Sequence, residues 1–135
     1  MTKVELDWFY GGGAANFWPE AWQKFAGLIP LAEQGDMIAA YHKRLFGEDA
    51  DAQITYARAW AGWENSLAVL EPLENRGSAN MPGEYARAFA RLENHYFING
   101  GFLSPDQAIL SNLDALADIP GVIVQGRYDM ICPPA

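Results

Sequence analysis

The chain has 135 residues, half of them hydrophobic, so it can bury the core of one modest domain. Nine basic and seventeen acidic residues give a formal net charge of -8, and no basic cluster is longer than Lys43-Arg44, which argues against binding to nucleic acid. The single cysteine, Cys132, excludes an intrachain disulfide and a zinc site built on a pair of cysteines, and we expect no cofactor.

The sequence shows no targeting or membrane signal. No apolar stretch approaches the roughly 20 residues that span a bilayer, and residues 1–5 lack the apolar core of a signal peptide. We therefore expect a soluble, cytoplasmic chain.

The first predicted elements are a short amphipathic segment, a glycine loop and a helix. Residues 4–10 are amphipathic but short, and they end at the flexible glycines 11–13, where a loop is expected. Asn16 is predicted to cap a helix that has Pro19 in its first turn and runs to Pro30. The apolar side chains of this helix follow helical spacing: Trp18, Trp22, Phe25 and Ile29.

Two further helices precede a polar loop. Asp36 is predicted to cap a helix over residues 37–46, and a longer helix is expected over about 50–70. One apolar stripe runs along the longer helix: Tyr56, Trp60, Trp63, Leu67 and Leu70. Residues 74–82 are polar and contain glycine and serine, which predicts a loop.

The last predicted elements are two helices and one strand. A helix is expected over about residues 83–97, and its apolar face carries Tyr85, Phe89, Leu92 and Tyr96. Ser104 and Pro105 indicate the start of another helix of about ten residues. Residues 122–124 are β-branched and predict a strand, which must pair either with a second copy of the chain or with a sheet the chain does not contain.

Two glutamates flank the predicted aromatic stripes. Glu64 follows the tryptophans of the long helix, and Glu93 lies beside the apolar face of the helix over 83–97. Two partly buried carboxylates at the edge of an aromatic pocket would suit a cationic ligand, because one ammonium group satisfies both charges. Alternatively, each is an ordinary surface glutamate paired with Arg58 or Arg91.

Asp129 directly follows the predicted strand. Open α/β sheets place functional side chains at this edge, and the acid of a nucleophile–histidine–acid triad often comes from such a position. It could equally be a turn aspartate that accepts hydrogen bonds from backbone amides two residues on. The spacing alone leaves both interpretations open.

No nucleophile is indicated by a motif. The chain has no G-x-S-x-G, and its two histidines, His42 and His95, lie within predicted helices, which favours packing or surface roles. Cys132 has no histidine placed to activate it, so a thiol that lines a pocket is the better interpretation. The glycines at 11–13 favour a plain loop over a phosphate cradle, because no strand precedes them and no Lys-Ser/Thr follows.

Four stretches of the chain resemble the prolyl aminopeptidase (proline iminopeptidase) family of the α/β-hydrolase superfamily. They extend over nearly the whole chain in the order found in that family: WFYGGGAANFWPEAW (8–22), WAGWENSL (60–67), ARLENHYFINGGF (90–102) and IPGVIVQGRYDMICPP (119–134). The chain departs from the family at Gly11-Gly12, where a polar pair is more common.

The resemblance implies a mainly α fold in two parts. Residues 1–103 would form the helical cap, and residues 104–135 would be a partial hydrolase core segment with one helix, one strand and the triad-acid loop. It further implies that Asp129 is the triad acid, that Glu64 and Glu93 bind the free ammonium of a peptide with N-terminal proline, and that Ile131 and Cys132 line the proline pocket.

The nucleophilic serine and the catalytic histidine of that family fall outside residues 1–135, so we expect an inactive fragment of a serine aminopeptidase. Two alternatives remain. The chain could be a stand-alone helical interaction module that forms homo-oligomers through exposed apolar faces or the terminal strand. It could also be the cap of another α/β hydrolase, such as an epoxide hydrolase or an esterase.

Overall fold

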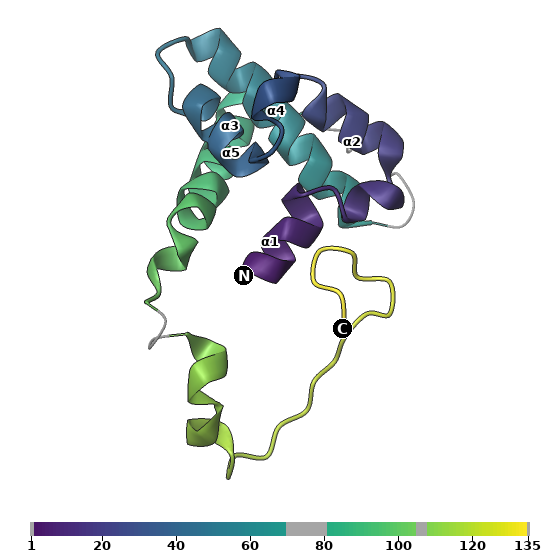
Figure 1. Ribbon diagram of the computed structural model, residues 1–135, viewed down its shortest axis with the longest axis vertical. Helices are drawn as coiled ribbons and strands as arrows, with labels where there is room; N and C mark the ends of the chain where they lie inside the picture. Colours follow the sequence, from purple (N-terminus) through teal and green to yellow (C-terminus); the bar gives the residue numbers. More distant parts are fainter. Residues whose placement is uncertain (1, 70–80, 105–107, 135) are drawn as a thin grey trace.

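The computed structural model describes residues 2–69, 81–104 and 108–134. Five α-helices carry the fold (Figure 1): α1 (Lys3–Tyr10), α2 (Pro19–Ala26), α3 (Met37–Leu45), α4 (Ala50–Leu67) and α5 (Gly83–Ile98). Short 3-10 segments accompany them: η1 (Ala14–Asn16), η2 (Leu31–Glu33), η4 (Gly100–Phe102) and η6 (Ile109–Leu116). The described part of the chain contains no strand, which confirms the predicted mainly α class.

Helix α4 lies at the centre of the core and packs against α2, α3 and α5. Its predicted stripe is confirmed, since Trp60, Trp63 and Leu67 are buried. Aromatic rings from the neighbouring helices fill the space around it, and the Phe25 and Tyr41 rings stack with their centroids 4.5 Å apart. The predicted position of Leu70 lies outside the described residues, as does most of the predicted loop over 74–82.

Helix α1 is a fully formed helix where the sequence suggested only a short amphipathic segment. A capping box closes its first turn, because the Thr2 side chain accepts from the Glu5 amide while the Glu5 carboxylate accepts from the Thr2 amide. The indole N–H of Trp63 donates to the Phe9 carbonyl at 3.1 Å and fixes the end of α1 against α4.

Helix α5 packs mainly through small residues, together with the half-buried Phe89 and Phe97. Ala86, Ala90 and Asn94 are fully buried. Most of the predicted apolar face is instead exposed, since Tyr85 and Leu92 are each 61% exposed and Tyr96 is 49% exposed. The reason is geometric, because small side chains let the backbone of α5 approach α4 closely while the α4 tryptophans fill the core.

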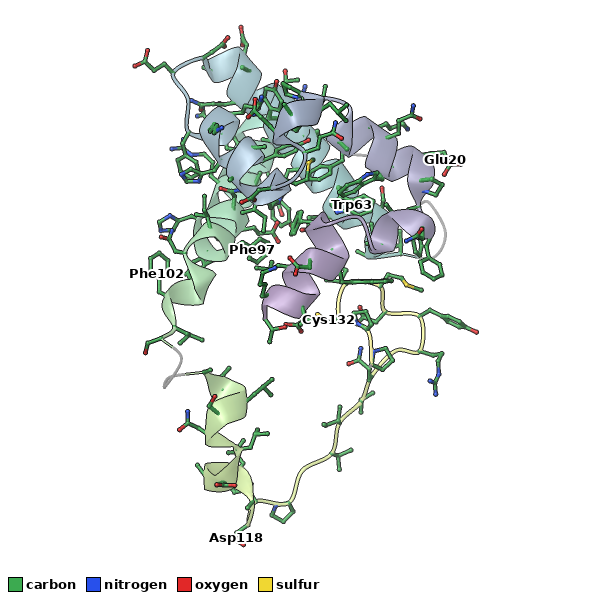
Figure 2. All side chains as sticks on the ribbon, in the orientation of Figure 1. Glu20, Trp63, Phe97, Phe102, Asp118 and Cys132 are labelled. Atoms are coloured by element: carbon green, nitrogen blue, oxygen red, sulfur yellow. The ribbon has the colours of Figure 1, made fainter. Side chains whose placement is uncertain are left out.

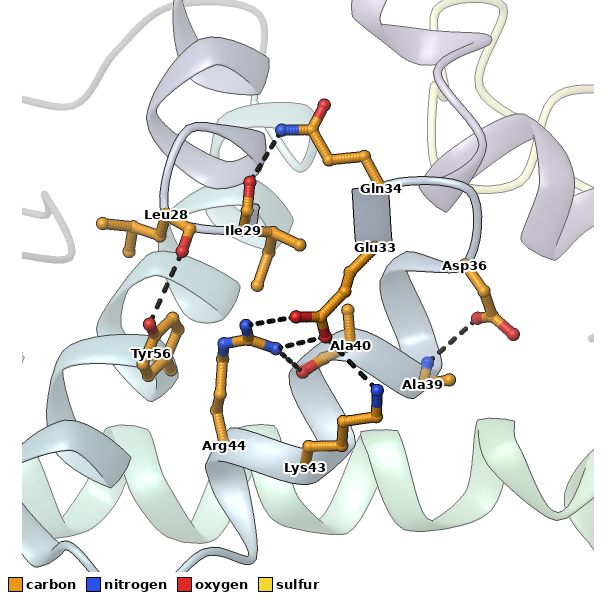
Figure 3. A network of polar contacts seen from close by, with 10 residues as sticks. All are labelled: Leu28, Ile29, Glu33, Gln34, Asp36, Ala39, Ala40, Lys43, Arg44 and Tyr56. Carbon is orange, nitrogen blue, oxygen red and sulfur yellow. Dashed lines mark hydrogen bonds and ion pairs between the residues drawn. The ribbon is translucent and has the colours of Figure 1, made fainter. Parts of the chain in front are cut away.

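The loops around α3 are fixed by polar contacts. Asp36 caps α3 as predicted and accepts from the Ala39 amide at 2.9 Å. Glu33 of η2 forms a two-point contact with Arg44, with both distances 3.1 Å (Figure 3). The cap predicted at Asn16 is wrong, because the Asn16 amide donates back to the Gly13 carbonyl and Trp18 occupies the N-cap position of α2.

The last described segment leaves the helices as an extended chain and returns to α1 (Figure 1). The strand predicted at Val122-Ile123-Val124 is not formed, and these side chains are 90 to 93% exposed. An extended segment becomes a strand only when a neighbouring chain pairs with its backbone, and the described residues offer none. The helix predicted after Ser104 starts at residues outside the described part, and 3-10 segment η6 follows there. No described helix is long and apolar enough to cross a membrane.

Candidate functional site

Helices α4 and α5 bring the two predicted glutamates to one place beside the C-terminal end of α1. The Tyr10 hydroxyl donates to Oε1 of Glu64. The indole N–H of Trp60 donates to Oε2 of Glu93 at 2.9 Å. Both glutamate side chains are half-buried, and each carboxylate accepts one hydrogen bond from the described residues.

Aromatic rings surround the two carboxylates. The Tyr10 ring stacks on Trp60 with centroids 4.6 Å apart, and the Phe97 ring lies 5.7 Å from Tyr10 and 6.3 Å from Trp60. Ring faces attract cations and also offer flat apolar surface. We call Tyr10, Trp60, Glu64, Glu93 and Phe97 the carboxylate cluster.

The surroundings of the cluster favour the protonated form of its carboxyl groups. Burial raises the pKa of Glu64 to about 8, and the negative charge of Glu93 adds to this rise. Burial also raises the pKa of Glu93, against the hydrogen bond from Trp60, which lowers it. At neutral pH these shifts favour a proton on the cluster.

The alternative in which the two glutamates form surface ion pairs is not observed. Among the described residues, neither Glu64 nor Glu93 has a cationic partner within ion-pair distance. The Arg91 guanidinium lies over the Phe46 ring, 4.5 Å from its centroid. Arg58 is exposed. The carboxylate cluster has no internal countercharge in the part of the chain that the structure describes.

Asp129 lies in a turn at the end of the extended segment. Its Oδ1 accepts from the amides of Ile131 and Cys132 at 3.1 and 2.9 Å, while its Oδ2 accepts from the Gln125 side chain at 3.1 Å. The hydrogen bonds to the backbone are those of a turn aspartate. They also hold the carboxylate in one orientation, which is what a triad acid requires.

The turn formed by residues 129–132, here called the acid turn, lies next to α1. The Trp8 indole N–H donates to the Met130 carbonyl at 2.9 Å, and Met130 and Ile131 pack against the helical core. Cys132 is exposed and lies near α1 (Figure 2). Burial of the sulfur raises the pKa of the Cys132 thiol, and the charges of Asp129, Glu5 and Glu64 act in the same direction. The charge of Glu64 thus acts on the thiol of Cys132, one of the two predicted pocket residues.

The two histidines have structural contacts. Nδ1 of His42 lies 2.7 Å from Oδ1 of the buried Asn94, whose amide donates to the Ile38 carbonyl and ties α5 to α3. The His95 ring contacts Tyr96 and Phe102. The described residues contain no group of His, Cys, Asp and Glu that could hold a metal ion.

Sequence reasoning missed the residues that orient the site. Tyr10 and Trp8 lie on a helix that was too short to interpret, and their partners are 54 and 122 residues away. Spacing within a helix indicates which side chains share a face, but not which donor of another helix will meet them. The periodicity of α4 places Trp60 in the core, but it does not indicate which acceptor its N–H meets.

Comparison with known proteins gives a consistent result. No family model matches the chain. The chain is similar to proline iminopeptidases from Arabidopsis thaliana (49% identity over 98% of this chain and 35% of the relative), Xanthomonas citri (41% over 98% and 42%) and Neisseria meningitidis (46% over 90% and 38%).

The chain spans 35 to 42% of the length of these curated relatives. Nearly all of the chain takes part in the similarity, including the helices that carry the carboxylate cluster and the segment that carries the acid turn. The chain is therefore similar, over nearly all of its length, to a segment of the proline iminopeptidases, as its sequence motifs indicated.

Proposed function

We propose that this chain is the part of a prolyl aminopeptidase that binds the substrate's N-terminal ammonium and supplies the triad acid. In this proposal residues 1–103 form the cap, and residues 104–135 form part of the hydrolase core. The observation that carries it is the carboxylate cluster, in which Glu64 and Glu93 meet among aromatic rings with no cation of the described chain to neutralise them.

An N-terminal ammonium fits this cluster by charge and by shape. The ammonium brings N–H donors for the free lone pairs of both carboxylates. Its positive charge would take the place of the proton that the pKa shifts favour on the cluster. A peptide with a blocked N-terminus offers no charge and would leave the carboxylates unpaired. The proline ring would contact Phe97, which is half-buried, whereas Tyr10 lies within the core; Ile131 and Cys132 would complete the pocket.

Asp129 is proposed as the acid of a Ser–His–Asp triad. Its Oδ1 is used by two backbone amides, so Oδ2, now bound by Gln125, is the oxygen available to an imidazole N–H. The carboxylate would orient the imidazole and stabilise its protonated form, while the imidazole takes the proton of a serine that attacks the prolyl carbonyl. The serine and the histidine are proposed to come from other parts of the whole enzyme.

Calorimetric titration of the purified 135-residue chain tests ammonium binding. The ligands are L-prolinamide and N-acetyl-L-prolinamide, which differ in the charged amine. We expect only the free amine to bind, and we expect Glu93→Gln to weaken its affinity by about tenfold, because one of two partly desolvated carboxylates is lost. Glu84→Gln is the matched control on the same helix, since Glu84 is exposed and paired with Arg87. Equal affinity for the two ligands would contradict the proposal.

The carboxylate cluster also separates this proposal from the cap of an epoxide hydrolase or an esterase. A neutral substrate gives no compensation for two carboxylates in an aromatic pocket, because it brings no charge to them. A neutral ester analogue of proline that bound as well as L-prolinamide would favour the other hydrolases. Hydrolysis of a proline arylamide by the 135-residue chain alone would contradict the part of the proposal that places the serine and the histidine elsewhere.

A stand-alone interaction module remains the second candidate. The observation in its favour is the set of large apolar side chains that α5 and the segment after it expose: Tyr85, Leu92, Tyr96, Phe102 and Leu103. Apolar side chains that gather on a surface favour association with another surface. On this view the chain forms homo-oligomers, either through α5 or through the extended segment around Ile123.

A further inference from the structure

One hydrogen bond joins the acid turn to the helices, beside the packing of Met130 and Ile131 on the core. The Trp8 indole N–H donates to the Met130 carbonyl at 2.9 Å. The other hydrogen bonds of the turn are internal to residues 125–132, where Asp129 accepts from two amides and Gln125 donates to the Cys132 carbonyl at 2.8 Å. Among the described residues, the Trp8 bond is the only hydrogen bond between residues 121–134 and helices α1 to α5.

The Trp8 ring is itself held in place by the glycine loop. A Cβ atom added at Gly13 would fall 2.6 Å from Cε3 of Trp8, so the indole lies in space that the missing side chain of Gly13 leaves open. The Phe17 ring packs on the indole, with centroids 6.2 Å apart and planes inclined by 56°. Contacts other than the hydrogen bond to Met130 therefore help to orient the indole N–H of Trp8.

Helix α1 contacts the carboxylate cluster as well as the acid turn. Tyr10, two residues after Trp8, donates its hydroxyl to Glu64. We propose that Trp8 is a positioning residue, which fixes the acid turn on α1 and thereby sets the separation between the ammonium site and Asp129.

This inference rests on the proposed function, and it explains how the enzyme would remove one N-terminal residue and not two or more. An aminopeptidase that removes a single N-terminal residue needs a constant distance between the bound ammonium and the reacting carbonyl. A misplacement of about 1 Å is enough to lower the rate of such a reaction strongly. A short helix that touches both sites is a rigid way to hold that distance.

The thiol of Cys132 offers a probe of the acid turn that does not depend on activity. Cys132 is the only cysteine of the chain, and it directly follows Ile131 in the turn. Burial and the carboxylates of Asp129, Glu5 and Glu64 raise the pKa of this thiol. Release of the turn from α1 should lower that pKa and increase the rate of reaction with a chromogenic disulfide reagent.

The test compares this rate in the wild type, Trp8→Phe and Trp18→Phe. The first substitution keeps a large aromatic ring but removes the N–H donor. Trp18 is a half-buried tryptophan whose N–H makes no hydrogen bond among the described residues, so it is the matched control. We expect Trp8→Phe to react about three to ten times faster than the wild type at pH 7.5, as loss of one hydrogen bond allows, and Trp18→Phe to react at the wild-type rate.

A second pair of variants tests Trp8 without changing its side chain. Alanine can adopt the helical backbone conformation of Gly13, but its Cβ would meet both the indole and the backbone oxygen of Trp8. Gly13→Ala should therefore displace Trp8 and give the same acceleration. Gly35→Ala is the control, since a Cβ there meets no atom within 4 Å. Wild-type rates in both Trp8→Phe and Gly13→Ala, with circular dichroism of the native chain, would overturn the inference.

Saturating L-prolinamide separates this inference from the proposed function. We expect the ligand to slow modification of Cys132 in the wild type and to lose this effect in Trp8→Phe, although Trp8→Phe still binds it. Failure of L-prolinamide to bind the wild type would contradict the proposed function, whereas the rates measured without ligand would still decide whether Trp8 holds the turn.

Discussion

Glu64 and Glu93 keep their carboxyl groups in a place where ionisation is costly. Each has a single protein donor, from Tyr10 or Trp60, and neither has a countercharge among the described residues. A chain selected for stability alone would gain by replacing them with apolar side chains. Their retention is explained if a ligand supplies the missing positive charge.

The protonation of Glu64 should make the stability of the chain depend on pH. A carboxyl whose pKa is about 8 when folded and about 4.5 when unfolded binds its proton more tightly in the folded state. The free energy of unfolding should therefore fall as the pH rises from about 4.5 to about 8, by about 5 kcal/mol. Urea unfolding at pH 5, 6, 7 and 8 measures this fall.

The variant Glu64→Gln should lose most of that pH dependence and be more stable than the wild type at pH 8. Glutamine keeps an oxygen for the Tyr10 hydroxyl but has no charge to bury. Glu84→Gln, on the exposed side of α5, should retain the wild-type slope. Parallel pH profiles for the wild type and Glu64→Gln would show that burial does not raise the pKa of Glu64.

The sequence identified the two glutamates but not what orients them. Their position beside aromatic stripes was visible in the spacing of α4 and α5. The donors were not, because Tyr10 reaches Glu64 from another helix and Trp60 was counted only as an apolar residue. Tertiary packing decides which residues far apart in the chain become hydrogen-bond partners. Helical periodicity does not predict that packing.

At the scale of elements, the interface between α4 and α5 depends on small side chains. Ala86 and Ala90 are completely buried, and Ile54 of α4 lies against Gly83 at the start of α5. This close approach brings Glu93 next to Trp60 and thus builds one half of the carboxylate cluster. Any increase in the spacing of the two helices should damage stability and ligand binding together.

Substitution Ala90→Leu tests this interface. A larger side chain cannot fit without moving α5, so we expect a loss of about 1 to 3 kcal/mol in the free energy of unfolding. Ala88→Leu on the exposed side of the same helix is the control and should change stability by less than about 0.5 kcal/mol. Equal stability of the two variants in urea would show that the helices are not packed as described.

The helices themselves were predictable, and their faces were less so. Asp36 at the start of α3 and the stripe of α4 follow directly from capping and periodicity. For α5 the large apolar residues indicated an amphipathic helix, yet the helix buries its alanines. Periodicity identifies the apolar face of a helix, but the size of the space beside it decides which side chains enter.

At the scale of the whole molecule, the described residues leave large apolar side chains uncovered on α5, on η6 and along the extended segment. The strand predicted at residues 122–124 is extended and exposed, because a strand needs neighbours that its own sequence does not reveal. In the proposed whole enzyme these surfaces would meet the rest of the protein. In the isolated chain they should lead to association.

Association of the chain can be measured by size-exclusion chromatography with light scattering. We expect a dimer or larger species, and we expect Leu92→Glu to weaken it by about tenfold in dissociation constant, because one exposed leucine is lost from the contact. Leu31→Glu replaces a leucine on η2 that is more exposed than Leu92, 85% against 61%, and should leave the association unchanged. A monodisperse monomer at all concentrations would contradict the expectation.

Proton release on ligand binding tests the central claim most directly. With its pKa raised to about 8, the Glu64 carboxyl should carry a proton at pH 7, and a bound ammonium should replace that proton. Calorimetric titration of the 135-residue chain with L-prolinamide in two buffers of different ionisation enthalpy counts the protons. We predict release of about one proton per ligand in the wild type and almost none in Glu64→Gln. Binding without proton release in the wild type would contradict an ammonium site at the carboxylate cluster.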